Sequence, residues 1–264
     1  MIFRHTTDLP KSPLPNADLL GWQLVSEADG MNFTCYEAHV PYESTVCLQS
    51  PEDGTTHIYY CISGEGSCIF ADDGTKYSLQ QKHIVALSSG LSCNLTISSP
   101  HGMRLFVVYC KDKAKSNTRV MRSVEDILGT ERDILVDNED GCGYSRRLLL
   151  RSDGFLIGFN ITSVDPGATF KMQYRNHLEL CYYYAGGKAT YNFDDEKVAV
   201  ESKADDKNGT AMIMNKHDKH TVNVNKSSAT EAAECICIFY PALVGKENHD
   251  FSEDGYSGYE LIED

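Results

Sequence analysis

The segment YRNHLEL at residues 174–180 decides the fold class, because charged and imidazole side chains alternate in it with leucines. His177 and Glu179 are two residues apart, so both project from one face of a β-strand while the leucines project from the other. A second polar cluster, HDKH at residues 217–220, follows further along the chain. Since a buried charge without a partner costs several kcal/mol, the pattern favours a metal or catalytic pocket inside a β-barrel. The alternative is a hydrogen-bonded histidine and a surface glutamate on an edge strand.

Length, charge and cysteine usage narrow the class of protein. The chain has 264 residues, of which 41% are hydrophobic, and this is enough to build a buried core. Its formal net charge is −14, and most of the excess acid lies in the second half, which argues against a nucleic-acid partner. The amino terminus lacks the apolar core of a signal peptide, and no run of about 18 apolar residues could span a bilayer, so we expect a cytoplasmic protein without a membrane partner. The ten cysteines show no C-x-x-C spacing and lie mostly in apolar runs, so we interpret them as buried free thiols.

The chain repeats itself at an offset of about 120 residues, which predicts two copies of one domain. RHTTDL at residues 4–9 recurs as RSVEDI at 122–127, and the hairpin at 60–66 recurs at 182–188. Each copy consists of short runs rich in Val, Ile, Tyr, Phe and Thr between glycine-rich turns, a texture typical of an antiparallel sandwich or barrel. We therefore predict an all-β protein with two barrels in tandem.

The junction between the copies is polar and carries one helix signal. Residues 111–117, KDKAKSN, are typical of a linker. A helical turn is expected after Ser123, because its spacing to Asp126 matches a capping box and Gly129 supplies a stop. The expected boundaries are a first domain at residues 1–110, a linker at 111–121 and a second domain at 122–264.

The two copies differ in what fills the pocket. Alignment on the glycine hairpins places His57 at the position of Glu179, and places GLSC at residues 90–93 opposite HDKH at 217–220. A single histidine among Thr and Ile is more often a satisfied core residue than a ligand. We therefore interpret the first copy as a structural partner domain and place the chemistry in the second.

Several separated motifs of the second copy carry a family resemblance. They are YSRRLLL at residues 144–150, DG at 153–154, YxNHLE at 174–179, HDKH at 217–220 and FxPALxGKENHD at 239–250. Together they resemble ectoine synthase, a family of small cupin enzymes, over about residues 120–252. The first copy resembles the same family more faintly, which would make the chain a bicupin with a degenerate first copy.

The resemblance implies a fold, a reaction and a set of site residues. The fold would be the jelly-roll-like double-stranded β-helix. The reaction would be the cyclisation of N-γ-acetyl-L-2,4-diaminobutyrate to ectoine, a compatible solute of osmotic stress, with loss of water and with Fe²⁺ or another divalent metal as cofactor. Carried over by position, the implied metal ligands are Glu179, Met212 and His220. The implied positions around the small-molecule substrate are Tyr144, Arg147, Asn160, Thr162, Tyr174, His177, Asp218, Phe239, Glu247 and His249.

Two positions depart from the family pattern. Tyr144 stands where the family has Trp, a change that keeps an aromatic wall and adds a hydroxyl. Met212 stands where the family has a metal-binding Tyr, and its thioether is a soft ligand poorly suited to Fe²⁺. The metal would then be held by Glu179, His220, waters and substrate, or by another side chain, with His217 and Tyr174 as the nearest candidates.

The chemistry assigns further roles. Arg147 is suited to clamp the substrate carboxylate with its planar guanidinium. Ring closure needs an acid and a base, for which we expect His177, Asp218 and Tyr174 to serve, with Glu247 and His249 as further ionisable candidates. The sequence does not show which of these residues acts as the acid and which acts as the base. For Glu247 and His249 the alternative is a solvated loop, and for His217 it is an exposed loop position.

Two other functions remain open. One is a cupin lyase or isomerase that acts on another small zwitterionic osmolyte, which product analysis would reveal. The other is a non-catalytic bicupin that binds a small amino-acid derivative or stores a metal, and that keeps its binding when Glu179 is replaced by Gln. We also expect the two barrels to pack against each other as a dimer of single barrels would, giving either a monomer or a homodimer.

Overall fold

The computed structural model describes most of the chain in detail. The described residues are 1–15, 17–49, 54–111, 117–174, 177–185, 188–193, 196–201, 209–224, 232–245, 250–251 and 257–258. Contacts divide the chain into two units, one of residues 1–8, 127–152 and 157–264 and the other of residues 9–126 and 153–156. We call the first the C-terminal unit and the second the N-terminal unit. Within the described residues, no helix has the length and apolar character needed to cross a membrane.

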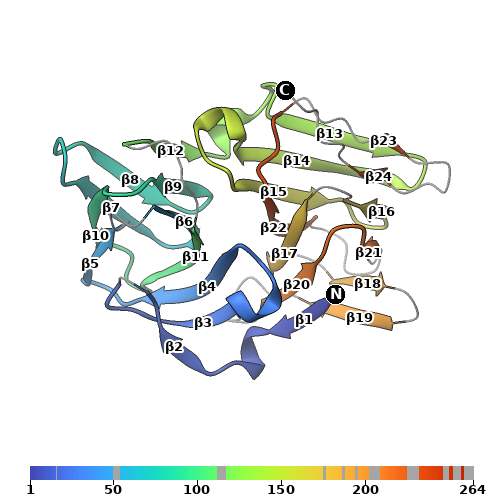
Figure 1. Ribbon diagram of the computed structural model, residues 1–264, viewed down its shortest axis with the longest axis horizontal. Coiled ribbons are helices and arrows are strands. Elements are labelled where there is room, and N and C mark those ends of the chain that lie inside the picture. Colours follow the sequence, from blue (N-terminus) through green and yellow to red (C-terminus); the bar gives the residue numbers. More distant parts are fainter. Residues whose placement is uncertain are drawn as a thin grey trace. The chain divides into compact units, whose positions relative to one another are not determined.

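The C-terminal unit is built from two β-sheets (Figure 1). Within the described residues, the spatial order of its larger sheet is β1 (Ile2–His5), β20 (Thr210–Met214), β17 (Leu178–Ala185), β22 (Ala233–Tyr240), β15 (Gly158–Val164), β14 (Gly141–Leu149) and β13 (Asp133–Asn138). The smaller sheet has the order β19 (Glu196–Glu201), β18 (Lys188–Phe193), β21 (Lys219–Val224), β16 (Thr169–Gln173), β24 (Ser257–Gly258) and β23 (Asp250–Phe251). Its pairs are antiparallel except β16 with β24, which is parallel.

The N-terminal unit repeats this plan. Its larger sheet has the order β12 (Arg119–Ser123), β9 (His83–Leu87), β6 (Thr55–Ser63), β11 (Met103–Lys111), β4 (Phe33–Val40), β3 (Leu20–Val25) and β2 (Lys11–Pro13). Its smaller sheet has the order β5 (Thr45–Gln49), β10 (Ser92–Ile97), β7 (Glu65–Phe70) and β8 (Lys76–Gln80). The two larger sheets therefore match strand for strand, and this repeat of topology supports the internal duplication that the sequence predicts.

The first strand of each sequence copy belongs to the other copy's unit. β1 pairs with β20 in the C-terminal unit, where Phe3 lies opposite Met212. β12 pairs with β9 in the N-terminal unit, although it follows the predicted first domain of residues 1–110. The last residues of the predicted linker, 119–121, are thus part of a strand. The units therefore differ from the expected boundaries, because β1 and β12 complete the edges of sheets formed by distant residues.

Short 3-10 helices connect strands in the described part of the chain. They are η1 (Thr6–Asp8), η2 (Glu27–Asp29), η3 (Glu125–Ile127) and η4 (Arg151–Asp153). The helical turn expected after Ser123 is confirmed by η3. The Ser123 amide donates to the Asp126 carboxylate over 2.7 Å, and the Asp126 amide donates to the Ser123 hydroxyl over 3.1 Å. This reciprocal pair is the capping box that the spacing predicts.

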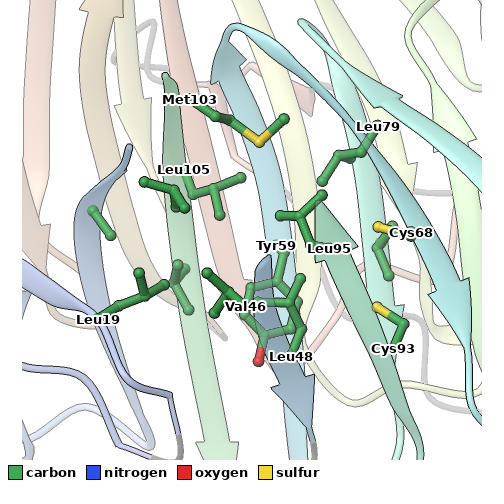
Figure 2. Packing of buried hydrophobic residues seen from close by; sticks show 14 of the residues in the cluster. Leu19, Val46, Leu48, Tyr59, Cys68, Leu79, Cys93, Leu95, Met103 and Leu105 are labelled. Atoms are coloured by element: carbon green, nitrogen blue, oxygen red, sulfur yellow. The ribbon is translucent and has the colours of Figure 1, made fainter. Parts of the chain in front are cut away.

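Both sheets of the N-terminal unit contribute to an apolar core between them. Leu48 and Leu95 come from the smaller sheet, while Tyr59 and Leu105 come from the larger one. Figure 2 shows these side chains packed together in the interior. The C-terminal unit has a corresponding core, but charged, phenolic and thiol side chains interrupt it, and these form the candidate site.

Candidate active site and metal centre

The interior of the C-terminal unit brings a carboxylate and an imidazole together. Glu179 lies on β17, opposite Met214 and Phe239 on the neighbouring strands, and is 1% exposed. His220 lies on β21 of the smaller sheet, opposite Met172, and is also 1% exposed. Oε2 of Glu179 and Nε2 of His220 are 3.9 Å apart. Among the described residues, neither atom has a hydrogen-bond partner.

Burial shifts the pKa of each group toward its uncharged form. Loss of solvent raises the pKa of Glu179 well above 4.5, the charge of Cys237 adds to this rise, and a hydrogen bond from Cys181 opposes it. Burial lowers the pKa of His220 from 6.5 to about 4, although the backbone of Asp218 partly opposes the shift. Both shifts favour the uncharged forms, which argues against an ion pair.

The pair has the donor set of a divalent cation site. A carboxylate oxygen and an imidazole nitrogen bind such ions at about 2.1 Å, which allows the two atoms to be up to about 4.2 Å apart. The observed 3.9 Å lies within that span. A cation also reverses the electrostatic effect of burial, because it stabilises the ionised carboxylate. The residues present therefore fit a metal held by Glu179 and His220.

A cavity opens beside Glu179. Its water-accessible volume is about 30 Å³. Aromatic rings form much of its wall: Phe239 packs edge-on against Tyr174 with ring centres 5.1 Å apart. Tyr191 also lines it and stacks on the His220 ring at 6.1 Å. Of the predicted site residues, those that line the cavity are Tyr144, Thr162, Tyr174, Glu179 and Phe239.

His177 and Arg147 are buried in the same unit. His177 is fully buried, and its Nδ1 lies 2.7 Å from the carbonyl oxygen of Pro241. Because that oxygen only accepts, Nδ1 carries the hydrogen, and in the neutral form of the ring the lone pair is at Nε2. Arg147 on β14 is 1% exposed and lies opposite Asn160 on β15. The Asn160 amide in turn donates to the Ser145 hydroxyl over 3.4 Å, and Ser145 lines the cavity.

Tyr144 borders the cavity but does not share the strand face of Arg147. Successive side chains alternate along β14, so Gly143, Ser145 and Arg147 share one face and Tyr144 projects from the other. The guanidinium of Arg146 lies 4.9 Å above the Tyr144 ring. The Tyr144 ring, expected to form an aromatic wall, therefore does not lie on the face of Arg147.

Asp218 and His217 lie in a tight turn between β20 and β21. The Asp218 carboxylate accepts the amide of Asn215 over 2.9 Å. His217 is exposed and has a left-handed φ of 71°, and its amide donates to the carbonyl of Tyr174 over 2.8 Å. The structure thus places Asp218 in a backbone-capping role outside the residues that line the cavity.

Met212 is fully buried on β20, opposite Cys181, in the apolar core. Its side chain is not among those that line the cavity within the described residues. The predicted residues Glu247 and His249 lie outside the described residues. The described metal donors from the predicted set are therefore Glu179 and His220.

The equivalent interior of the N-terminal unit is filled. Strand register places His57 at the position of Glu179 and Cys93 at that of His220. His57 is fully buried, its Nδ1 lies 3.2 Å from the Tyr59 hydroxyl, and its ring packs edge-on against Tyr109 at 4.4 Å. His57 is thus packed into the core, with its Nδ1 hydrogen-bonded.

Sequence reasoning missed a group of thiols beside Glu179. Cys181 donates its thiol hydrogen to Oε1 of Glu179 over 3.1 Å, and its sulfur lies 3.5 Å from that of Cys237. The Cys237 sulfur is also 3.6 Å from that of Cys235. Hydrogen bonds from the other two thiols lower the pKa of Cys237. The signal was present in the sequence, because Cys181 and Glu179 are two residues apart, as are Cys235 and Cys237, so each pair shares one strand face.

Comparisons with solved structures identify the fold. Protein Ylba from E. coli superposes with a TM-score of 0.68 at 15% identity, covering 90% of both chains. A cupin 2 conserved barrel domain protein from Leptotrichia buccalis superposes with a TM-score of 0.56 at 12% identity, covering 90% of this chain and 96% of that one. These likenesses confirm the predicted all-β cupin fold.

Comparisons of sequence identify the family. Residues 119–260, more than half of the chain, match the family described as ectoine synthase. The L-ectoine synthase of Desulfosudis oleivorans is 36% identical over 146 residues, which are 55% of this chain and 99% of that protein. The L-ectoine synthase of Desulfatibacillum aliphaticivorans is 35% identical over the same shares. The matched segment contains the buried pair of Glu179 and His220. The chain belongs to the ectoine synthase family.

Proposed function

We propose that the C-terminal unit cyclises N-γ-acetyl-L-2,4-diaminobutyrate to ectoine with loss of water, assisted by a divalent metal at Glu179 and His220. Family membership makes the chain an enzyme of the lyase class. The observation that carries the proposal is the short distance between Glu179 Oε2 and His220 Nε2, with Glu179 lining a cavity walled by aromatic and hydroxyl side chains. Fe²⁺ is the metal we would supply first. The cytoplasm is the location in which we would look for the protein.

The reaction needs the two ends of a flexible substrate to be held together. Arg147 is 1% exposed and lies opposite Asn160 in the sheet. Together these two residues are suited to hold the substrate carboxylate, since a guanidinium binds a carboxylate with two parallel hydrogen bonds. Tyr174 and Phe239 form an aromatic wall that would confine the carbon chain.

Ring closure forms a bond between the amine nitrogen and the amide carbon and breaks the bond to the carbonyl oxygen. That oxygen leaves as water with two protons taken from the nitrogens of the new ring. His177 is suited to move a proton, because its Nδ1 hydrogen is held by Pro241 and its lone pair is at Nε2. A bound metal would polarise the amide carbonyl as a Lewis acid.

Direct product analysis tests this function. The full chain is incubated without oxygen with Fe²⁺ and N-γ-acetyl-L-2,4-diaminobutyrate, and ectoine is measured by NMR. We expect ectoine from the wild type and little from Glu179→Gln. Substrate binding without turnover would contradict the proposal and favour a non-catalytic binding protein. Conversion of a related zwitterion but not of this substrate would favour another cupin lyase or isomerase.

A further inference from the structure

Three cysteine side chains meet inside the barrel of the C-terminal unit. Cys181 lies on β17 directly opposite Cys237 on β22, and Cys235 is two residues before Cys237, so all three project from one face. The sulfur of Cys237 is 3.5 Å from that of Cys181 and 3.6 Å from that of Cys235. All three sulfur atoms lie within 4.8 Å of one another and are buried. They line the same cavity as Glu179.

The fold itself does not require sulfur at these positions. In the N-terminal unit, strand register places Tyr59 at the position of Cys181, and places Leu105 and Val107 at those of Cys235 and Cys237. These three residues form ordinary apolar core there. Figure 2 shows Tyr59 and Leu105 in that core. The same barrel layer thus packs well without thiols, so the cluster is a property of the C-terminal sequence.

The spacing of the sulfur atoms matches thiolate ligands of one metal ion. Zinc binds thiolates at about 2.3 Å in tetrahedral geometry, which puts the sulfur atoms about 3.8 Å apart. The separations of 3.5 and 3.6 Å between Cys237 and the other two sulfur atoms need only small outward shifts to reach about 3.8 Å. The sulfur atoms of Cys181 and Cys235 lie within 4.8 Å of each other, which is compatible with the same value. A cation of this size therefore fits among the three sulfurs without a change of strand register.

Two neighbours complete the environment. Oε1 of Glu179 lies 3.1 Å from the Cys181 sulfur, so it is placed to provide a fourth, oxygen ligand. The hydroxyl of Thr162 lies 3.3 Å from the Cys237 sulfur and can donate a hydrogen bond to it once that sulfur is a thiolate. Such outer hydrogen bonds orient metal ligands and reduce their charge. Soft sulfur ligands select Zn²⁺ over hard cations.

We propose that Cys181, Cys235 and Cys237 form a binding site for Zn²⁺ or a similar thiophilic ion, with Glu179 as the fourth ligand. Three of its four ligands are thiols that do not belong to the pair of Glu179 and His220. The two sites share only the carboxylate of Glu179. Zn²⁺ at the thiols would therefore compete with a hard metal at His220. The proposal stands on the sulfur geometry and does not depend on the reaction of the enzyme.

Cobalt substitution tests the site. The full chain is reduced with a phosphine, freed of metal with a chelator and titrated with Co²⁺, whose thiolate complexes absorb in the near ultraviolet by sulfur-to-metal charge transfer. We expect this band to saturate at one equivalent and to disappear when Zn²⁺ is added. A titration in which Co²⁺ binds without the band, or does not bind, would overturn the proposal whatever the variants do.

Variants assign the band to its ligands. Cys237→Ser should abolish it, and Thr162→Val should weaken Zn²⁺ binding by about 10- to 100-fold, as loss of an outer hydrogen bond does. Cys61→Ser is the matched control, because Cys61 is a fully buried thiol on β6, the strand of the N-terminal unit that corresponds to β17. His220→Ala should also keep the band. A band that persists in folded Cys237→Ser, or is lost in folded His220→Ala, would show that the three thiols do not form the site.

Discussion

The carboxyl of Glu179 and the imidazole of His220 face each other at 3.9 Å, and burial shifts the pKa of each toward its uncharged form. An ion pair at this depth would need further hydrogen bonds to offset the loss of water, and within the described residues Oε2 and Nε2 have none. The arrangement is better suited to a ligand that supplies positive charge. The metal-free protein therefore contains a poorly solvated pair whose protonation affects its stability.

The first prediction concerns the pH dependence of that stability. The pKa of Glu179 is raised in the folded state, so its stabilising proton is fully bound below pH 4.5 and is lost as pH rises through the folded pKa. The pKa of His220 falls from 6.5 to about 4, so stability is lost as pH decreases through that window. Above pH 6.5 the His220 contribution is constant, and the free energy of unfolding should decrease by up to about 1.4 kcal/mol per pH unit until the folded pKa of Glu179 is passed.

Replacement of Glu179 by Gln removes this dependence. Urea unfolding in the presence of a chelator should show the variant gaining on the wild type from pH 6.5 to about pH 8. Glu37→Gln is unsuitable as a control because Glu37 is paired with Arg104. Glu65→Gln, on an exposed strand position, is suitable. Parallel pH curves for wild type and Glu179→Gln would contradict the assigned protonation.

The second prediction contrasts the two barrels. Glu179→Ala or His220→Ala should lower kcat by about 10²- to 10³-fold, because metal polarisation of a carbonyl is worth several kcal/mol. His57→Ala, at the equivalent position of the N-terminal unit, should leave kcat per folded molecule nearly unchanged. It should cost about 1–3 kcal/mol of stability instead, since it removes a buried partner of Tyr59. Steady-state kinetics on the three variants, with unfolding measured alongside, checks both parts, and equal losses of kcat would mean that the first barrel also takes part.

The fold was largely predictable from the sequence, because period-two alternation and glycine hairpins are local signals. The same alternation directs Glu179 inward, and strand register reproduces the alignment of His57 with Glu179. The exchange of β1 and β12 was not predictable, because strand pairing between distant residues leaves no local pattern. The thiol cluster was missed for a different reason: buried cysteines pack as small hydrophobes, and only register shows that Cys181 meets Cys237.

Asp218 shows where residue type alone misleads. A carboxylate between two histidines in the sequence suggested acid or base chemistry, but the structure ties it to the amide of Asn215 in a turn. The left-handed conformation of His217 lets that turn form. The alternation of polar and apolar residues along the strands does not predict this conformation. The position of a side chain relative to a tight turn depends on backbone geometry that the sequence does not display directly.

The third prediction follows from that turn. Asp218→Asn should keep kcat within about 10-fold of the wild type, a far smaller loss than general acid or base removal causes. Asp218→Ala should lower the free energy of unfolding by about 1 kcal/mol, as loss of a hydrogen bond to a backbone amide does. Kinetics and urea unfolding of both variants provide the measurement. A loss of kcat above 100-fold in a stable Asp218→Asn protein would restore the catalytic role expected from the sequence.

The fourth prediction concerns how the first strand is attached to the barrel. The amide of Gly209 donates to the Thr6 hydroxyl over 2.9 Å, and its carbonyl accepts the Thr6 amide over 3.0 Å. A Cβ at this position would lie 1.8 Å from the hydroxyl oxygen of Tyr182, whose side chain is fully buried. Gly209→Ala should therefore displace the strand end and lower the free energy of unfolding by about 1–3 kcal/mol, the usual range for overpacking.

Gly158→Ala is the matched control, because its added Cβ would meet neighbours at ordinary distances of 3.4 to 3.5 Å. Thermal unfolding should show a clear decrease in Tm for the first variant and little change for the second, and an unchanged Tm for Gly209→Ala would show that the attachment of the strand tolerates movement at Tyr182.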